Sequence, residues 1–140
     1  WERAAADPSA IVSHASAASL RGLGTIIPTL PDLTQTSQRS RREEIRFHVA
    51  PFAPADWDWL DVAGLRLPVT TPARTIIDLL LGHEDGEYLA RAARQSFDAP
   101  GDALAALTTA ATRRKARHGH LVELAARLVR DAYPEPRRAS

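Results

Sequence analysis

Residues 65–80 read LRLPVTTPARTIIDLL, and the change of pattern within this stretch decides the fold. Before Thr70 the residues favour a strand, whereas after it the apolar positions recur with the helical period of about 3.6. Thr71 is a favourable N-cap residue, and Pro72 suits the first position of a helix. The sequence therefore predicts a helix from here to Gly82 that acts as a scaffold, with one apolar stripe formed by Ala73, Ile76, Ile77 and Leu80.

Upstream of this stretch, the sequence predicts one short helix and a small, mostly antiparallel sheet of three or four strands. Ser13 is the expected N-cap of the helix, which ends at Gly22 or Gly24. Alternating or Thr-rich segments at 33–37 and 44–49 predict two strands, with Ile45, Phe47 and Val49 on one side of the second. Residues 62–65 are typical of a hairpin turn that leads into a strand over 66–69.

Downstream, the helical period predicts three further helices. We expect them over about 86–98, closed by Pro100, from about Asp102 to Gly119, and over about 120–132. The residues expected to face inward are Leu89, Ala93, Ser96, Phe97, Leu104, Leu107, Ala111, Leu121, Leu124, Ala125, Leu128 and Ala132. Strands followed by helices predict an α+β fold in a single domain over 1–133, with a helix and sheet at 8–70, a helical part at 71–133 and a frayed tail at 134–140.

The composition restricts the possible classes of protein. The chain has 140 residues, of which 44% are hydrophobic and 25% charged, as in a globular domain. Without cysteine it has no disulfide, thiolate nucleophile or Cys-based zinc site. It has no long apolar run and no signal-peptide pattern, so we expect no membrane contact and a cytoplasmic location. Because it lacks methionine and begins with Trp1, we expect a piece of a longer product.

A search for catalytic constellations predicts that the chain is not an enzyme and has neither metal nor cofactor. The glycine-rich phosphate and dinucleotide motifs are absent, and the only lysine, Lys115, does not belong to the Glu-x-Lys step of many nucleases. His118 and His120 lack a third metal ligand nearby in the sequence. His14 is expected to be a hydrogen-bonded structural residue, and His48 to face solvent.

Asp56, Asp58 and Asp61 form an acidic segment together with Trp57 and Trp59. We interpret it as the start of a strand, with solvated aspartates and one buried indole. An alternative interpretation is that this segment is a protein-binding face.

Two groups of basic residues are the candidate binding sites for nucleic acid or another acidic partner. Arginine donates bidentate hydrogen bonds to phosphate oxygens, and clusters of arginine attract nucleic acid without reading its sequence. The first group surrounds the connection between two strands, and the second lies at a helix end. Their members are Arg39, Arg41, Arg42 and Arg46 in the first group, and Arg113, Arg114, Lys115 and Arg117 in the second.

The order of the segments resembles the AbiEi family of bacterial antitoxins from type IV toxin-antitoxin systems. The residues that carry the resemblance lie at 11–23 (IVSHASAASLRGL), in the strand pair that ends with Ile45-Arg46-Phe47-His48, and at 64–79 (GLRLPVTTPARTIIDL). It covers roughly residues 8–132. Family members typically have a winged-helix DNA-binding domain before this region, so the chain resembles their C-terminal, antitoxin-associated part.

The resemblance implies a non-enzymatic regulator that opposes a nucleotidyltransferase-type toxin and assists binding to promoter DNA. The toxin can be a direct partner or only a functional one, and the oligomeric state is left open. One alternative is a protein–protein interaction module. Another is an accessory region of a nuclease-associated protein, without activity of its own.

Overall fold

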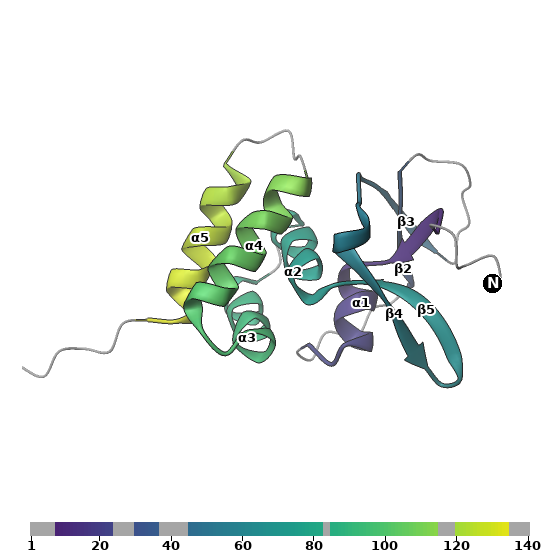
Figure 1. Ribbon diagram of the computed structural model, residues 1–140, viewed down its shortest axis with the longest axis horizontal. Coiled ribbons are helices and arrows are strands. Elements are labelled where there is room, and N and C mark those ends of the chain that lie inside the picture. The colour runs from purple at the N-terminus through teal and green to yellow at the C-terminus, as the bar shows by residue number, and fades with distance from the viewer. Residues whose placement is uncertain (1–7, 24–29, 37–44, 83–84, 115–119, 135–140) are drawn as a thin grey trace, which may run out of the picture.

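The sheet and the C-terminal helices lie at opposite ends of the molecule, with α1 (His14–Leu20) between them (Figure 1). The computed structural model describes residues 8–23, 30–36, 45–82, 85–114 and 120–134. These residues form a five-stranded sheet and five α-helices, most of them in the C-terminal half. The predicted α+β class is therefore confirmed.

The sheet contains the strands β1 (Ala10–Val12), β2 (Asp32–Gln35), β3 (Arg46–Val49), β4 (Trp57–Val62) and β5 (Leu65–Thr70). Their order is β3-β2-β1-β5-β4. The pairs β1–β2 and β4–β5 are antiparallel, whereas β1–β5 and β2–β3 are parallel. The sheet is thus mixed, and not mostly antiparallel with three or four strands. The difference arises because the very short strand β1 lies at the centre and pairs in parallel with a strand far along the chain, and because β2 and β3 also pair in parallel.

The predicted hairpin between β4 and β5 is confirmed. Its turn is formed by Ala63 and Gly64, whose φ angles are 50° and 83°. Two successive positive φ angles match the type I′ turn, whose twist suits a two-residue hairpin.

The other elements are the 3-10 turn η2 (Pro54–Asp56) and the helices α2 (Pro72–Leu81), α3 (Gly86–Ser96), α4 (Pro100–Arg114) and α5 (Leu121–Ala132). We expected Pro100 to close the preceding helix, but it is the first residue of α4. A proline suits the first turn of a helix, where its missing N–H is not needed. Gly119, the expected end of α4, lies outside the described residues.

Helix α2 is the central element, and its predicted ends are confirmed. The Thr71 side chain accepts a hydrogen bond from the Arg74 backbone N–H at 3.2 Å, and Gly82 is the C-cap residue. The helix packs against α1, α3, α4 and α5 (Figure 1). Because it has neighbours on most sides, it buries polar positions as well as Ile76 and Ile77 of the predicted stripe, whereas Ala73 and Leu80 are only partly buried.

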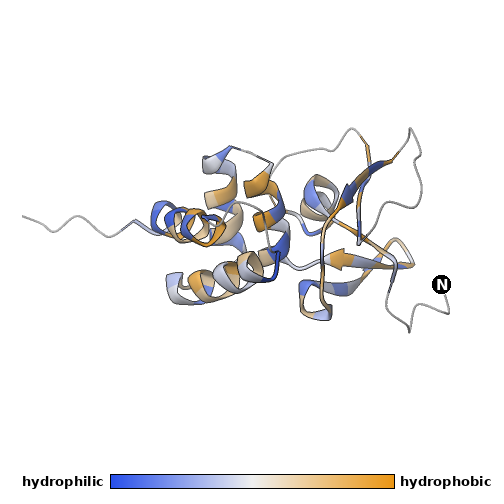
Figure 2. Cartoon of the chain, turned by 90° about the horizontal axis from the view of Figure 1, so that it is seen from above, coloured by the Kyte–Doolittle hydropathy of each residue, from blue (hydrophilic) through white to orange (hydrophobic). Residues whose placement is uncertain are grey.

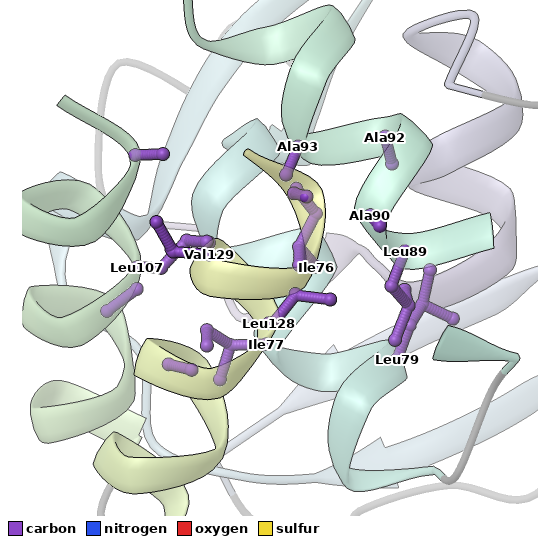
Figure 3. Close-up of a cluster of buried hydrophobic side chains, with 14 of the residues drawn as sticks. Ile76, Ile77, Leu79, Leu89, Ala90, Ala92, Ala93, Leu107, Leu128 and Val129 are labelled. Atoms are coloured by element: carbon purple, nitrogen blue, oxygen red, sulfur yellow. The ribbon is translucent and has the colours of Figure 1, made fainter. Parts of the chain in front are cut away.

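The main hydrophobic core lies among α2, α3, α4 and α5, where their apolar faces meet (Figures 2 and 3). Small alanines let these helices approach closely, and larger side chains fill the space between them. The larger members are Leu23, Ile76, Ile77, Leu79, Tyr88, Leu89, Leu107, Leu121, Leu128 and Val129. Leu104 is exposed, contrary to expectation, and Leu124 and Phe97 are only partly buried.

The end of β5 contacts two segments that lie far from it in the sequence, β1 and the end of α1. Val12 of β1 pairs with Val69 of β5. Arg21, at the C-terminal end of α1, donates through Nε to the Thr70 carbonyl at 2.6 Å and through Nη2 to the Val69 carbonyl at 3.2 Å. The end of β5 is therefore held by both β1 and α1.

None of the helices in the described part of the chain has the length and apolar character needed to cross a membrane.

Candidate functional site: a charge network between sheet and helices

A guanidinium lies buried where α2 meets the rest of the molecule. Arg74 is fully buried, as are Asp56 of η2 and Asp78 on the next turn of α2. Arg74 Nε donates to Asp78 Oδ1 at 3.0 Å, and Arg74 Nη1 lies 3.3 Å from Asp56 Oδ2. Arg74 and Asp78 are four residues apart on one helix face, and this i,i+4 pair belongs to a larger buried network.

Two arginines from the end of α4 complete this network. Arg113 Nε donates to Asp56 Oδ1 at 2.9 Å, and Arg114 Nε donates to Asp78 Oδ1 at 3.0 Å. Asp56 also accepts a hydrogen bond at 2.9 Å from the backbone N–H of Ala53. The network of Arg74, Arg113, Arg114, Asp56 and Asp78 therefore joins η2, α2 and α4.

The network leaves some buried polar atoms without a hydrogen-bond partner among the described residues. They are Nη1 and Nη2 of Arg74 and Oδ2 of Asp78. The 3.3 Å contact of Arg74 Nη1 with Asp56 is an ion pair without hydrogen-bond geometry. Buried donors without partners cost free energy, and they mark a site that water or a ligand can complete.

A second polar cluster lies at the start of α1 and the neighbouring strands. The rings of His14 and His48 stack with their centroids 3.6 Å apart and their planes inclined by 13°. His48 Nε2 lies 3.0 Å from Asp32 Oδ1, so His48 does not simply face solvent, as the sequence suggested. Ser16 donates to Asp32 Oδ2 at 3.3 Å and accepts from the Asp32 backbone N–H at 2.8 Å.

His14 is the structural histidine that the sequence predicted. Its Nδ1 lies 2.8 Å from Ser13 Oγ, which accepts the hydroxyl proton of Thr34 at 2.7 Å. Burial lowers the pKa of His14 from 6.5 to about 4, against the opposing effect of the Asp78 charge. The charges of His48 and Arg114 lower it further, whereas Asp32 raises it. His14 is therefore neutral at pH 7 and lies within electrostatic reach of the charge network.

Asp32 is ionised at neutral pH although it is buried. Burial raises the pKa of its carboxyl, but the hydrogen bond and charge of His48, together with the charges of His14 and Arg46, hold the pKa below its ordinary value. Arg46 adds to this effect, with its Nη1 3.8 Å from Asp32 Oδ1. Ser13, the hydroxyl beside the histidine pair, is fully buried, so it does not offer a nucleophile to an external substrate.

The structure describes three of the eight basic residues predicted as binding sites, and each of them contacts a buried carboxylate. Arg46 lies near Asp32, while Arg113 and Arg114 belong to the charge network. The other five, which are Arg39, Arg41, Arg42, Lys115 and Arg117, lie outside the described residues.

The acidic segment differs from its predicted form. Asp58 and Asp61 are exposed as expected, but Asp56 is fully buried. Its charge is tolerated there because the Ala53 backbone N–H, Arg74 and Arg113 donate to it or pair with it. Trp57 and Trp59 are both partly exposed and meet edge to face, with centroids 5.2 Å apart.

The sequence signals for the charge network were incomplete. The four-residue spacing of Arg74 and Asp78 places both on one helix face, but Asp56 and the end of α4 are brought to this pair only by the fold. No group of three or more His, Cys, Asp or Glu side chains suited to a metal ion occurs in the described ranges.

Comparison of the chain with models of known protein families and with curated proteins gave no match.

Proposed function

We propose that this chain is a non-enzymatic antitoxin and regulatory domain of a bacterial type IV toxin-antitoxin system, acting in the cytoplasm. In this proposal it opposes a nucleotidyltransferase-type toxin and assists promoter binding through its arginines. The phosphate contacts add affinity, and sequence reading belongs to other elements.

The observation that carries the proposal is the packing of the two segments that resemble AbiEi antitoxins. Residues 11–23 and 64–79 are far apart in the chain, yet they meet through the Val12–Val69 pair and the Arg21 hydrogen bonds. Helix α1 also packs on α2. The resemblance thus involves one contiguous unit of the fold, which supports a shared architecture.

Fluorescence anisotropy with labelled DNA tests the regulatory part. One duplex comes from upstream of the chain's own gene, the other is its scrambled counterpart, and each is titrated at several salt concentrations. We expect binding that weakens with salt, because arginine–phosphate contacts release counterions. Replacing both Arg41 and Arg42 with alanine should flatten the log-log salt dependence by roughly one unit per lost contact.

The matched control replaces Arg91 and Arg130, which are exposed on α3 and α5, with alanine. It removes the same charge from the helical surface and should change the slope much less. Failure of the wild-type chain to bind either duplex at low salt would contradict the DNA part of the proposal.

Co-expression tests the antitoxin part. A nucleotidyltransferase-type toxin of a type IV system is induced in cells with and without the chain, and growth is recorded. The chain should restore growth. Unrestored growth, with the chain present at normal levels in the cells, would contradict antitoxin action.

One observation favours a second candidate, a protein interaction module. The β4–β5 hairpin displays Leu65, 64% exposed, and Trp59, whose ring lies beneath the Arg66 guanidinium at 5.4 Å from its centroid. Partly exposed tryptophan and arginine are common at protein interfaces. Partner binding that is insensitive to salt and lost in Leu65→Ser would favour this candidate over DNA binding.

A further inference from the structure

Among the described residues, the side chains of Arg113 and Arg114 are each hydrogen-bonded through one nitrogen. Both use Nε to bind a buried carboxylate, and no hydrogen bond joins their Nη1 or Nη2 to the described residues. Their side chains are 32% and 17% exposed. Each guanidinium thus has a fixed anchor and terminal donors that remain for another group.

The charge of the network favours an anion as that group. Three arginines face two aspartates, which gives a surplus of one positive charge (3 − 2) in a partly buried place. The neighbouring His14 is neutral at pH 7 and does not add to this charge. The buried Nη1 and Nη2 of Arg74 have no hydrogen-bond partner among the described residues. A positively charged network with unused donors is suited to an oxyanion.

The anchoring by Asp56 and Asp78 also restricts the orientation of the two guanidiniums. A guanidinium fixed through Nε loses little further side-chain entropy when its terminal nitrogens bind a ligand. The aspartates do not repel the anion strongly, because the arginines neutralise them. This arrangement favours arginine, since all three donors of lysine lie on one nitrogen, whereas arginine can hold its anchor with Nε and present Nη1 and Nη2 to a ligand.

We propose that Arg113 and Arg114 form a preorganised binding site for a phosphate group at the C-terminal end of α4. The inference rests on the proposed function and deepens it, because it assigns phosphate contacts to two particular residues. Phosphate can come from a nucleic-acid backbone or from free phosphate, and the arms of the experiment separate these sources.

The first experiment uses the unaltered chain and records the arginine Nε–Hε signals by NMR. Inorganic phosphate is added in one arm, with sodium chloride of equal ionic strength as its control, and the promoter duplex is added in the other. We expect the signals of Arg113 and Arg114 to shift, and those of the exposed Arg91 and Arg130 to shift much less.

Shifts in both arms would support a site for phosphate from either source, and shifts with the duplex alone would support a site for backbone phosphates. The absence of selective shifts at Arg113 and Arg114 in both arms would overturn the inference. If the duplex still bound by anisotropy, the proposed function would stand without this site. If free phosphate bound there but no duplex did, the site would stand and the proposed DNA contact would fail.

The second experiment compares Arg113→Lys and Arg114→Lys with the control Arg91→Lys by titration with inorganic phosphate. Each of the first two should weaken phosphate binding roughly tenfold, the change expected for loss of a charge-assisted contact. Circular dichroism verifies that each variant is folded, and the NMR measurement on the unaltered chain decides the question if one is not. Affinity equal to that of the control in folded variants would overturn the inference.

Discussion

Arg74 occupies a position in the interior where most helices place an aliphatic side chain. It is tolerated there because Asp56 and Asp78 lie on either side of it, one from the segment before the hairpin and one from its own helix. Desolvating these charges is costly, so the net stabilisation by the network is smaller than its ion pairs suggest. Removing one charged partner nevertheless costs considerable stability, since the charges that remain are then buried without full compensation.

At this scale we predict that Arg74→Met lowers the free energy of unfolding by about 3 kcal/mol. Methionine retains the length of the side chain but removes its charge, which leaves the two aspartates to Arg113 and Arg114 alone. Urea denaturation measures the change, with the exposed Arg91→Met as the matched control. An Arg74→Met variant as stable as this control would show that Arg113 and Arg114 alone compensate the charges of the two buried aspartates.

His14 should make stability depend on pH. Its pKa is about 4 in the folded chain and 6.5 when it is free of the fold, so between these values the unfolded chain binds more protons. Stability should therefore be complete above pH 6.5 and fall as the pH is lowered towards 4, by at most about 3 kcal/mol. The charged groups that act on His14 are Asp78, His48, Asp32 and Arg114. A variant changed only at His14 retains all four, so its comparison with the unaltered chain isolates the titration of His14.

The suitable variant is His14→Asn, because His14 has a φ of 53° and asparagine tolerates this conformation. Its denaturation midpoint should change less between pH 7 and 4.5 than that of the unaltered chain. Parallel profiles for the two proteins would assign the acid sensitivity to another group. Loss of the ionised Asp32 belongs to a lower window, below its ordinary pKa.

Among the elements, the β4–β5 hairpin has a turn whose sequence is not the best for its shape. Ala63 adopts a left-handed conformation that costs a residue with a Cβ atom roughly 1–2 kcal/mol, whereas the following Gly64 adopts it freely. Asparagine followed by glycine is the preferred pair for a type I′ turn.

Ala63→Asn should therefore raise the free energy of unfolding by about 0.5–1 kcal/mol. The reciprocal change, Gly64→Ala, should lower it by about 1 kcal/mol, because alanine would then adopt the same strained conformation. Thermal unfolding of the two variants provides the measurement. A destabilised Ala63→Asn protein would argue against this turn type.

The elements that the sequence predicted best are those determined by neighbouring residues. The start of α2 at Thr71-Pro72, its end at Gly82 and the Ala63-Gly64 turn all depend on local conformational preferences. Strand β1 was not predicted, because it is too short to show a periodic pattern. The burial of Asp56 was also missed, since its partners Arg74 and Arg113 lie in helices much further along the chain.

In the whole molecule, the sheet and the helical core are connected through α2 and the charge network, so we expect them to unfold together. Leu107→Ala tests this, because Leu107 is fully buried in the helical core, far along the chain from the tryptophans of β4. A cavity at this position should cost about 2–5 kcal/mol. Helix loss by circular dichroism and the change in tryptophan fluorescence should shift to the same lower denaturant concentration.

The matched control is Leu104→Ala, on the same helix but exposed, which should shift neither transition appreciably. A fluorescence transition that stayed at its original midpoint in Leu107→Ala, while the helical signal moved, would show that the sheet unfolds independently.

The central position of β1 in the sheet has a kinetic consequence. Val12 meets Val69 across a long stretch of chain, so the middle of the sheet cannot close until β5 is available. The β4–β5 ribbon and the start of α2, by contrast, are local and can form early. Joining distant segments requires a loop-closure entropy that local hairpins avoid. We therefore expect β1 to be among the last strands to take its place, with the rate of folding set by the slow search that brings the two halves of the sheet together.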